Sequence, residues 1–450
     1  MPIRLVVLVA LCLAFPLVAS ADPATAPHAF VHDVGDAGIL PRLQAVLGLI
    51  VMIAGCWIFR DKRPGQKFPW RVVGAGVTMQ LVFAALVLKS SQANKFFSWV
   101  NDAFVALMNF SNDGARFLFG DLVSGTAVVA FSVLPTIIFF SSLMTVGYHS
   151  GIMVRIVRVF AKGLARFMGT SGAESLSTVG NIFLGQTEAP LMVRPFLPKM
   201  TRSELHCIMV GGFGTVAGGV MAAYVGMLHK AFPDIAGHLL AASIMAAPAT
   251  VLVSKLLVPE TEVPETGPDS TIEVPRLHEN VIDAAAAGAS EGLHLALNVG
   301  AMLIAFIALV ALANAMLGWT LGLFGFEGVT LQKLLGYFFT PVAWLIGISA
   351  EESPAVGSLL GVKIVLNEFV AYLDLAKNLA SPQALSPRAA IITAYALCGF
   401  ANFASIAIQI GGIAAMAPER RKDLATLGLR AMLGGSVVGY MTGGLAGLFV

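Results

Sequence analysis

The chain has 450 residues, of which 57% are hydrophobic and only 12% charged, with a mean hydropathy of +0.82 and a formal net charge of +2. Soluble domains carry roughly 25% charged residues, so this composition excludes an ordinary soluble protein and favours a polytopic membrane protein. The sequence has no basic tail or Cys/His spacing typical of nucleic-acid-binding proteins. Its four cysteines lie in apolar stretches without a CxxC pair, which indicates neither a disulfide framework nor a metal site.

The N-terminal segment, residues 1–21, resembles a signal peptide. Arg4 precedes an apolar core, and Ala19-Ser20-Ala21 has the small-x-small pattern of a signal peptidase site. We favour a cleaved signal over a retained helix. Under either interpretation, the chain after Ala21 is expected to lie outside the cytoplasm.

Basic residues predict which ends of the following apolar segments face the cytoplasm, because Lys and Arg are retained on that side. Spans are expected at about 40–59 and 71–89, with the strongly basic segment 60–71 between them. Residues 90–121 are mixed and aromatic, as expected for an interfacial segment. A third span, at about 123–147, meets "MVRIVRVFAKGLARF", whose bases lie along an amphipathic helix better suited to the membrane surface than to a soluble connector.

Residues 172–198 are predicted to form a re-entrant hairpin. The basic helix precedes them, and Arg194, Lys199 and Arg202 close them, so both flanks are expected to be cytoplasmic. The stretch is too short for two full spans, which need about 20 residues each. The polar cluster "GQTE" would therefore form the tip of a segment that enters the membrane and returns.

Two further spans are expected at about 204–228 and 237–257. The first contains "GGFGTVAGGV", and because glycine costs helix stability this cluster indicates an unwound or closely packed helix. Residues 259–291 form an acidic, proline-rich cytoplasmic loop and connector with the composition of a disordered spacer.

The second half repeats this order. Its expected elements are a span at about 293–318, an amphipathic piece near 330–348, a hairpin over 350–378, and spans at about 388–415 and 428–449. The hairpin is again an apolar stretch interrupted by polar residues, Asn367 and Glu368. Both termini of the mature chain would then lie outside the cytoplasm.

The two halves also resemble each other locally. "ESLSTVGNIFLGQTEAP" and "ESPAVGSLLGVKIVLNEFV" both begin Glu-Ser, pass Val-Gly and reach a polar cluster containing an acid. Because the halves start from opposite sides of the membrane, they form an inverted repeat. The predicted organisation is N-terminal scaffold helices at 22–121, a first repeat at 122–258 and a second repeat at 292–450.

The predicted fold is thus an all-α polytopic membrane protein with about eight transmembrane helices and two opposed re-entrant hairpins. Inside hydrocarbon, broken backbone and acids are tolerated where they line a protein cavity, and transporters bind substrate at such places near the midplane. The alternative for Glu188 and Glu368 is a structural hydrogen bond between helices.

The polar segments carry a resemblance to a known family. "GQTEAPLMVRPFLPKMTRSEL", "GVKIVLNEFVAY" and "GFANFASI" are similar to the signature segments of concentrative nucleoside transporters, and the similarity extends over about 40–450. The resemblance implies a homotrimer in the cytoplasmic (inner) membrane, whose protomers each import nucleosides by an elevator-like movement of the hairpin-bearing part against a trimeric scaffold. It implies no enzymatic activity.

The resemblance also assigns site residues. Those expected to face the nucleobase are Gln186, Thr187, Glu188 and Val220; those expected to hold the ribose hydroxyls are Glu368, Asn402 and Ser405, with Phe400 beside the sugar or base. The chemistry is suitable, because a carboxylate accepts two hydrogen bonds from vicinal hydroxyls and a glutamine amide both donates and accepts. These residue types alone would indicate a polyhydroxylated heterocycle or a sugar.

The coupling ion is expected to be sodium. The family's sodium site corresponds here to Asn181, Leu184, Thr187, Thr215 and Val216, with Leu184 and Val216 acting through their carbonyls. A proton remains an alternative, because a low-dielectric site could raise the pKa of Glu188. A proton-coupled carrier of another polar metabolite, a passive channel and an intramembrane enzyme are further alternatives. Opposed hairpin tips argue against a channel, and the sequence has no His-x-x-x-His metal pair within a span.

Overall fold

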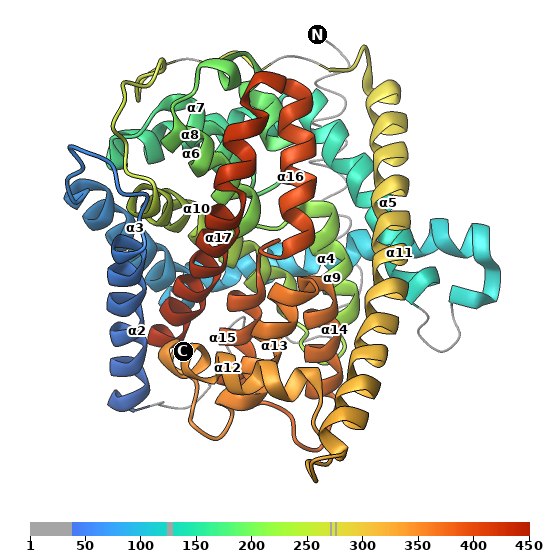
Figure 1. The fold of residues 1–450 in the computed structure, drawn as a ribbon. Coiled ribbons are helices and arrows are strands. Elements are labelled where there is room, and N and C mark those ends of the chain that lie inside the picture. Colours follow the sequence, from blue (N-terminus) through green and yellow to red (C-terminus); the bar gives the residue numbers. More distant parts are fainter. Residues whose placement is uncertain (1–37, 124–128, 271, 275–276) are drawn as a thin grey trace.

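The computed structural model describes residues 38–123, 129–270, 272–274 and 277–450 (Figure 1). Every regular element of this described part is helical, which confirms the all-α prediction. The predicted signal segment lies outside the described residues. The helices of the first half are α2 (Ile39–Ile58), α3 (Trp70–Lys89), α4 (Ser91–Phe119), η1 (Gly120–Val123), α5 (Val129–His149), α6 (Ile152–Met168), α7 (Gly172–Gly180), η2 (Ala189–Lys199), α8 (Arg202–Gly214), α9 (Gly218–Leu228) and α10 (Ile235–Leu257).

The second half begins with α11 (Val281–Gly322), which is longer than the span predicted at 293–318. The residues that extend it, "VIDAAAAGASEG", are rich in alanine, the best helix former, and Asn280 caps the new start by accepting from the amides of Ile282 and Asp283. The remaining helices are α12 (Leu331–Leu345), α13 (Ser353–Val365), α14 (Glu368–Leu379), α15 (Pro387–Leu397), α16 (Phe403–Met416), η3 (Pro418–Arg420) and α17 (Arg421–Phe449).

The length and apolarity of these helices confirm a multi-pass membrane protein. Among the described residues, α2, α3, the α8–α9 pair, α10, α11 and the α17 region can each cross a bilayer. Helix α5 passes the same test together with α6, from which it bends by 74°. Helices α15 and α16, separated by a break at residues 398–402, cover the remaining predicted span.

The two hairpins enter from opposite ends of the molecule. The first comprises α7 and η2, and the second comprises α13 and α14. Figure 1 shows α6, α7 and α8 gathered at one end of the molecule and α12, α13 and α14 at the other. This arrangement confirms the predicted inverted repeat with two opposed re-entrant hairpins.

Helices α5 and α11 form a closely packed pair along one side of the molecule (Figure 1). A Cβ atom at Gly288 would lie 2.6 Å from Thr145 Oγ1, and one at Gly292 would lie 2.8 Å from the Ile138 Cα. The missing side chains therefore let the two backbones approach, as small residues commonly do between membrane helices. Most of α11 is otherwise uncovered, since only 11% of its apolar window is buried.

The other broken and unbroken spans form the interior. The apolar window of α8–α9 is 94% buried and that of α10 is 89% buried, so neither presents a face to lipid. Helices α2 and α3 cover this interior by packing on α10 and α17. At the end of the molecule where α8 begins, Asp61 of the α2–α3 loop pairs with Arg202 of α8 at 3.2 Å and with Arg430 of α17 at 3.5 Å. These helices are thus joined into one body.

Two capping boxes fix where the first hairpin and α8 begin. Ser171 accepts a hydrogen bond from the Glu174 amide, and the Glu174 carboxylate accepts one from the Ser171 amide. Thr201 and Glu204 make the same pair of bonds at the start of α8. Each box satisfies amides at a helix N-terminus that is buried in the protein.

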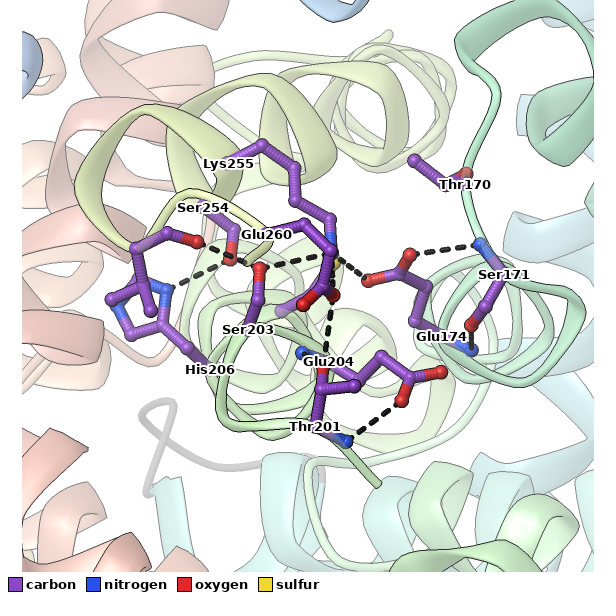
Figure 2. Close-up of polar contacts among 12 residues, drawn as sticks. Thr170, Ser171, Glu174, Thr201, Ser203, Glu204, His206, Ser254, Lys255 and Glu260 are labelled. Atoms are coloured by element: carbon purple, nitrogen blue, oxygen red, sulfur yellow. Dashed lines mark hydrogen bonds and ion pairs between the residues drawn. The ribbon is translucent and has the colours of Figure 1, made fainter. Parts of the chain in front are cut away.

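Lys255 joins these two helix starts (Figure 2). Its ammonium lies 2.8 Å from Glu174 Oε2, 3.3 Å from Glu260 Oε2 and 3.0 Å from Ser203 Oγ. The side chains of Lys255 and Glu174 are 5% and 1% exposed, so the charges are removed from water and depend on each other. Glu260 also accepts from Thr201 at 2.8 Å, which brings the chain after α10 into the same network. The first hairpin therefore has a rigid base.

We predict that Lys255→Met destabilises the protein by about 3–5 kcal/mol, because it leaves a buried carboxylate without its counter-ion. Lys199→Met is the matched control: Lys199 pairs with Glu265 at 3.1 Å, but its side chain is 71% exposed, so the cost is below about 1 kcal/mol. Unfolding in detergent micelles measures both variants. Equal stabilities for the two variants would contradict the assigned role of Lys255.

Candidate functional site

The acid of the second hairpin lies at the start of its returning helix. Asn367 caps α14 by accepting from the Val370 amide, and Glu368 is the first residue of the helix. Glu368 is only 5% exposed. One carboxylate oxygen accepts from the Tyr224 hydroxyl and the other from Asn402 Nδ2, both at 2.9 Å. The α14 N-terminus also favours a negative charge at this position.

The tip of the first hairpin reaches the same region. Gln186 Nε2 donates to Ser405 Oγ at 3.4 Å, and the Ser405 amide donates to Asn402 Oδ1 at 2.9 Å. Because Asn402 also bonds Glu368, hydrogen bonds run without interruption from one hairpin to the other. The structure therefore brings together four of the predicted residues, Gln186, Ser405, Asn402 and Glu368, in a chain that we call the polar bridge.

Two residues that the sequence analysis missed form hydrogen bonds to the polar bridge. Tyr224, fully buried on α9, bonds Glu368, and Gln409 Nε2 donates to Gln186 Oε1 and to the Met209 carbonyl, both at 3.1 Å. Both lie four residues after a predicted residue, Tyr224 after Val220 and Gln409 after Ser405. Since positions four apart share a helix face, this spacing was the available signal.

Thr187 and Glu188 lie beside the polar bridge rather than in it. Thr187 Oγ1 donates to Glu188 Oε1 at 3.0 Å. Glu188 lines a cavity of about 440 Å³ between the first hairpin, the bend from α5 to α6 and the start of α11. Other polar residues of this cavity are Ser141, Tyr148, Arg155, His278 and Glu291. Its lining includes Arg155 and Arg158 of the basic helix α6, which follows the end of α5 expected to be cytoplasmic.

The two apolar candidates have different surroundings. Val220 is buried on α9, with 3% of its surface exposed. Phe400 is partly buried in the break between α15 and α16, where its carbonyl accepts from the Asn402 amide at 2.8 Å. Phe400 thus precedes Asn402 of the polar bridge by two residues in this break. The roles predicted for Val220 and Phe400 in ligand contact remain predictions.

Asn181 has the features of an oxygen ligand for a cation. It is the C-cap residue of α7 and is completely buried. Its Nδ2 donates to the Ser177 carbonyl at 3.1 Å, whereas its Oδ1 has no hydrogen-bond partner among the described residues. A buried oxygen without a donor is costly unless a ligand approaches it.

The break between α8 and α9 lies against Asn181. A Cβ atom at Gly211, in the last turn of α8, would be 3.2 Å from Asn181 Nδ2. Thr215 has extended backbone angles and donates its hydroxyl to the Gly211 carbonyl at 2.8 Å, which leaves lone pairs on its oxygen. Thr215 and Val216 fall between the two helices, so their carbonyls are outside the helical ladder. Together these residues fit a hard cation that prefers neutral oxygen ligands.

Comparison with known families covers most of the chain. Residues 47–122 match the family described as Na+ dependent nucleoside transporter N-terminus, and residues 238–447 match its C-terminus. Residues 130–231, which contain the first hairpin, match a family described as nucleoside recognition.

Individual proteins give the same relationship. The chain is 44% identical over 411 residues to the uncharacterized transporter YutK of Bacillus subtilis, covering 91% of this chain and 99% of that protein. It is 37% identical to the human sodium/nucleoside cotransporter 1 over 90% of this chain and 64% of that protein. Among solved structures, CNTnw in an inward-facing substrate-bound state has a TM-score of 0.84 and 43% identity, covering 91% of this chain and 98% of that one.

We predict that Asn402→Ala destabilises the protein by about 2–4 kcal/mol, because it removes both the α16 cap and a donor to the buried Glu368 carboxylate. Asn280→Ala is the control, since Asn280 caps α11 with the same kind of bond in an exposed position and its loss costs about 1 kcal/mol. Unfolding of the two variants in micelles tests the difference. A smaller loss for Asn402→Ala would show that the polar bridge adds nothing to the cap.

Proposed function

Because this chain belongs to the Na+-dependent nucleoside transporter family, we propose that it is a secondary active symporter that imports nucleosides into the cytoplasm, driven by a sodium gradient. The observation that carries the proposal is the polar bridge, which joins two opposed hairpin tips inside an apolar protein. A polar solute that crosses a membrane must exchange its water for such groups.

The polar bridge contains suitable partners for a nucleoside. Glu368 accepts two hydrogen bonds, as vicinal ribose hydroxyls require, and Asn402 and Ser405 add polar groups beside it. Gln186, whose amide both donates and accepts, is suited to the edge of a base. Thr187, Glu188 and Val220 complete the proposed base side of the site, and Phe400 offers a flat apolar wall.

Binding would proceed by exchange of hydrogen bonds. In the polar bridge the side chains satisfy one another, with Gln186 bonded to Ser405 and Asn402 bonded to Glu368. A nucleoside that separates the hairpin tips would replace these bonds with its own hydroxyl and base groups. The cost of opening the polar bridge is then offset by the ligand, so the site closes again when it is empty.

The cavity beside Glu188 supports a route to the cytoplasm. Its volume of about 440 Å³ lies within the range of small-molecule pockets. Its lining extends from Arg158 of the basic helix α6 to Gly185 and Glu188 at the tip of the first hairpin. We infer that a nucleoside leaves the polar bridge through this cavity when the transporter faces inward.

Sodium is proposed to bind where the first hairpin meets the α8–α9 break. The proposed ligands are Asn181, Leu184, Thr187, Thr215 and Val216. The Oδ1 of Asn181 supports this placement, because it is a buried acceptor without a hydrogen-bond donor among the described residues and could ligate a cation. Thr187 belongs to both proposed sites, which would couple ion binding to nucleoside binding. The alternative is proton coupling through Glu188.

Movement is proposed to follow the division between the α5–α11 pair and the rest. The hairpins, α8–α10 and α15–α17 would move as one body against α5 and α11, in an elevator-like way. A homotrimer is proposed to hold α11 at its centre, because α11 leaves a long apolar surface uncovered. Exposed residues on this surface are Leu293, Leu297, Ile304, Leu312 and Met316. The proposed location is the cytoplasmic membrane, with both mature termini outside the cytoplasm.

We predict that Glu368→Gln weakens uridine and adenosine binding by about 10–150-fold, the loss of about 1.5–3 kcal/mol expected for a charge-assisted hydrogen bond. Glu352→Gln is the control, because Glu352 lies at the outer end of the same hairpin and bonds Ser386. Calorimetric titration of the purified variants measures both. Unchanged affinity in Glu368→Gln would remove the carboxylate from the nucleoside site.

We predict that Asn181→Ala raises the sodium concentration for half-maximal uptake by about tenfold, because a cation loses one oxygen ligand. Radiolabelled uridine uptake into proteoliposomes, with an imposed sodium or proton gradient in turn, measures this effect. Asn314→Ala is the control, because Asn314 lies in the C-terminal part of α11, bonds Gln332 and is not a proposed sodium ligand. Uptake driven only by the proton gradient would replace sodium with the proton alternative.

A further inference from the structure

Lys363 is a buried cation for which the proposed transport cycle has so far given no role. It lies in α13 of the second hairpin, and none of its surface is exposed. Its Nζ donates to the Ala396 carbonyl at 3.0 Å. A buried lysine is rarely tolerated unless its charge is compensated, so this position calls for an explanation.

The ammonium lies between two helix C-termini. Lys363 belongs to the last turn of α13, and Ala396 belongs to the last turn of α15, immediately before the break at 398–402. Both helix ends carry partial negative charge, which favours a cation. Helix α17 closes the third side: a Cβ atom at Gly439 would lie 2.7 Å from the Ala396 carbonyl oxygen and 3.2 Å from Lys363 Nζ.

The first repeat has the corresponding place without a lysine. Helices α7, α8 and α10 correspond there to α13, α15 and α17. Asn181 ends α7 and lies against Gly211 in the last turn of α8. From α10, Thr250 lies against Gly214, with its Oγ1 3.3 Å from a Cβ built on that glycine. Among the described residues, neither Asn181 Oδ1 nor Thr250 Oγ1 has a hydrogen-bond partner.

The two repeats thus differ in the chemical groups that occupy this junction of three helices. Where hairpin helix, broken helix and closing helix meet, the second repeat holds an ammonium and the first holds unpartnered oxygens. We propose that Lys363 is a fixed cation that takes, in the second repeat, the place that sodium takes in the first. This inference rests on the proposed sodium site at Asn181.

The charges of the two hairpins agree with this assignment. Each hairpin carries an acid near its tip: Glu368 in the second is buried, at 5% exposed, whereas Glu188 in the first is exposed in the cavity that it lines. Lys363 lies five residues before Glu368 in the same hairpin, so the two side chains bring opposite charges into one element. Residues 172–193 of the first hairpin contain no Lys or Arg, and Glu174 at its base is already paired with Lys255. The buried acid of the second hairpin therefore has a cation within its own hairpin, whereas the first hairpin supplies no basic side chain to the junction at Asn181.

The assignment gives Lys363 a positioning role in nucleoside binding. Because the ammonium holds the end of α13 against the end of α15, it fixes Glu368 relative to Asn402, which follows the α15 break. Removal of the charge would release these helix ends from each other. A sodium ion could replace the ammonium only if the new side chain supplied an oxygen ligand and left space.

The test compares four purified variants of the full chain: Lys363→Asn, Lys363→Met, Lys363→Arg and the control Lys377→Met. Lys377 lies in α14 of the same hairpin but is 66% exposed and pairs with Asp374. The first readout is the unfolding temperature at increasing NaCl, with choline chloride keeping ionic strength constant and no nucleoside present. The second is equilibrium binding of radiolabelled sodium. The third is uridine affinity.

We expect the wild type and Lys377→Met to respond to sodium as single-site proteins. In choline chloride, Lys363→Asn and Lys363→Met should both unfold at least about 5 °C below the wild type and bind uridine at least about tenfold more weakly. Sodium should recover more of this loss in Lys363→Asn than in Lys363→Met. The dependence of the unfolding temperature on sodium should be steeper in Lys363→Asn than in the wild type, with a Hill coefficient rising from about 1 towards 2. Lys363→Arg should keep the single-site response.

The proposal is overturned if Lys363→Met matches the wild type in unfolding temperature and uridine affinity, or if Lys363→Asn and Lys363→Met respond identically to sodium. If neither variant folds, Lys363→Met/Glu368→Gln takes their place. It should fold and be more stable than Lys363→Met, because the two opposite charges are removed together, and failure to recover stability contradicts the pairing. Absence of any sodium effect in the wild type would instead contradict the proposed function.

Discussion

The structure depends on one constraint: a helix that begins or ends inside a membrane protein must find partners for the polar backbone groups at that terminus. Two hairpins and two broken spans place such ends in the protein interior. Asparagine supplies the partners repeatedly, since Asn367 caps α14 and Asn402 caps α16. Each of these residues lies next to, or bonds, the acid at 368. The groups that satisfy the backbone therefore lie at the site proposed to bind the nucleoside.

The sequence predicted the helices well because apolar length and flanking charge determine them directly. It predicted Gln186, Asn402, Ser405 and Glu368 as a group, and the structure places them in one chain of hydrogen bonds. It missed Gln409, because the four-residue spacing from Ser405 places it on the same helix face but does not identify its partner, Gln186 of the first hairpin. The separation of Glu188 from the polar bridge was also unpredictable, since it depends on side-chain direction at a tight tip.

Rigidity and mobility are assigned to different parts of the chain. Lys255 binds the starts of the first hairpin and α8 to the chain after α10, and Asp61 binds the α2–α3 loop to α8 and α17. By contrast, α5 and α11 pack closely at glycines of α11. Among the described residues, no ion pair joins these two helices. Ion pairs thus hold one body together and close packing at glycines holds the other, as the proposed elevator-like movement of two bodies requires.

The acidic segment between the repeats also connects these two parts of the protein. Its early residues are fastened to the hairpin body: the Gly267 carbonyl accepts from the Gly172 amide at 3.1 Å, and the Ile272 carbonyl accepts from Arg158 at 3.3 Å. Helix α11 begins directly after its cap residue, Asn280. The connection from Ile272 to Asn280 spans eight residues, whose fully extended length is at most about 26–29 Å. In the proposed elevator-like movement, the length of this connection therefore limits how far α11 can shift relative to the hairpin body.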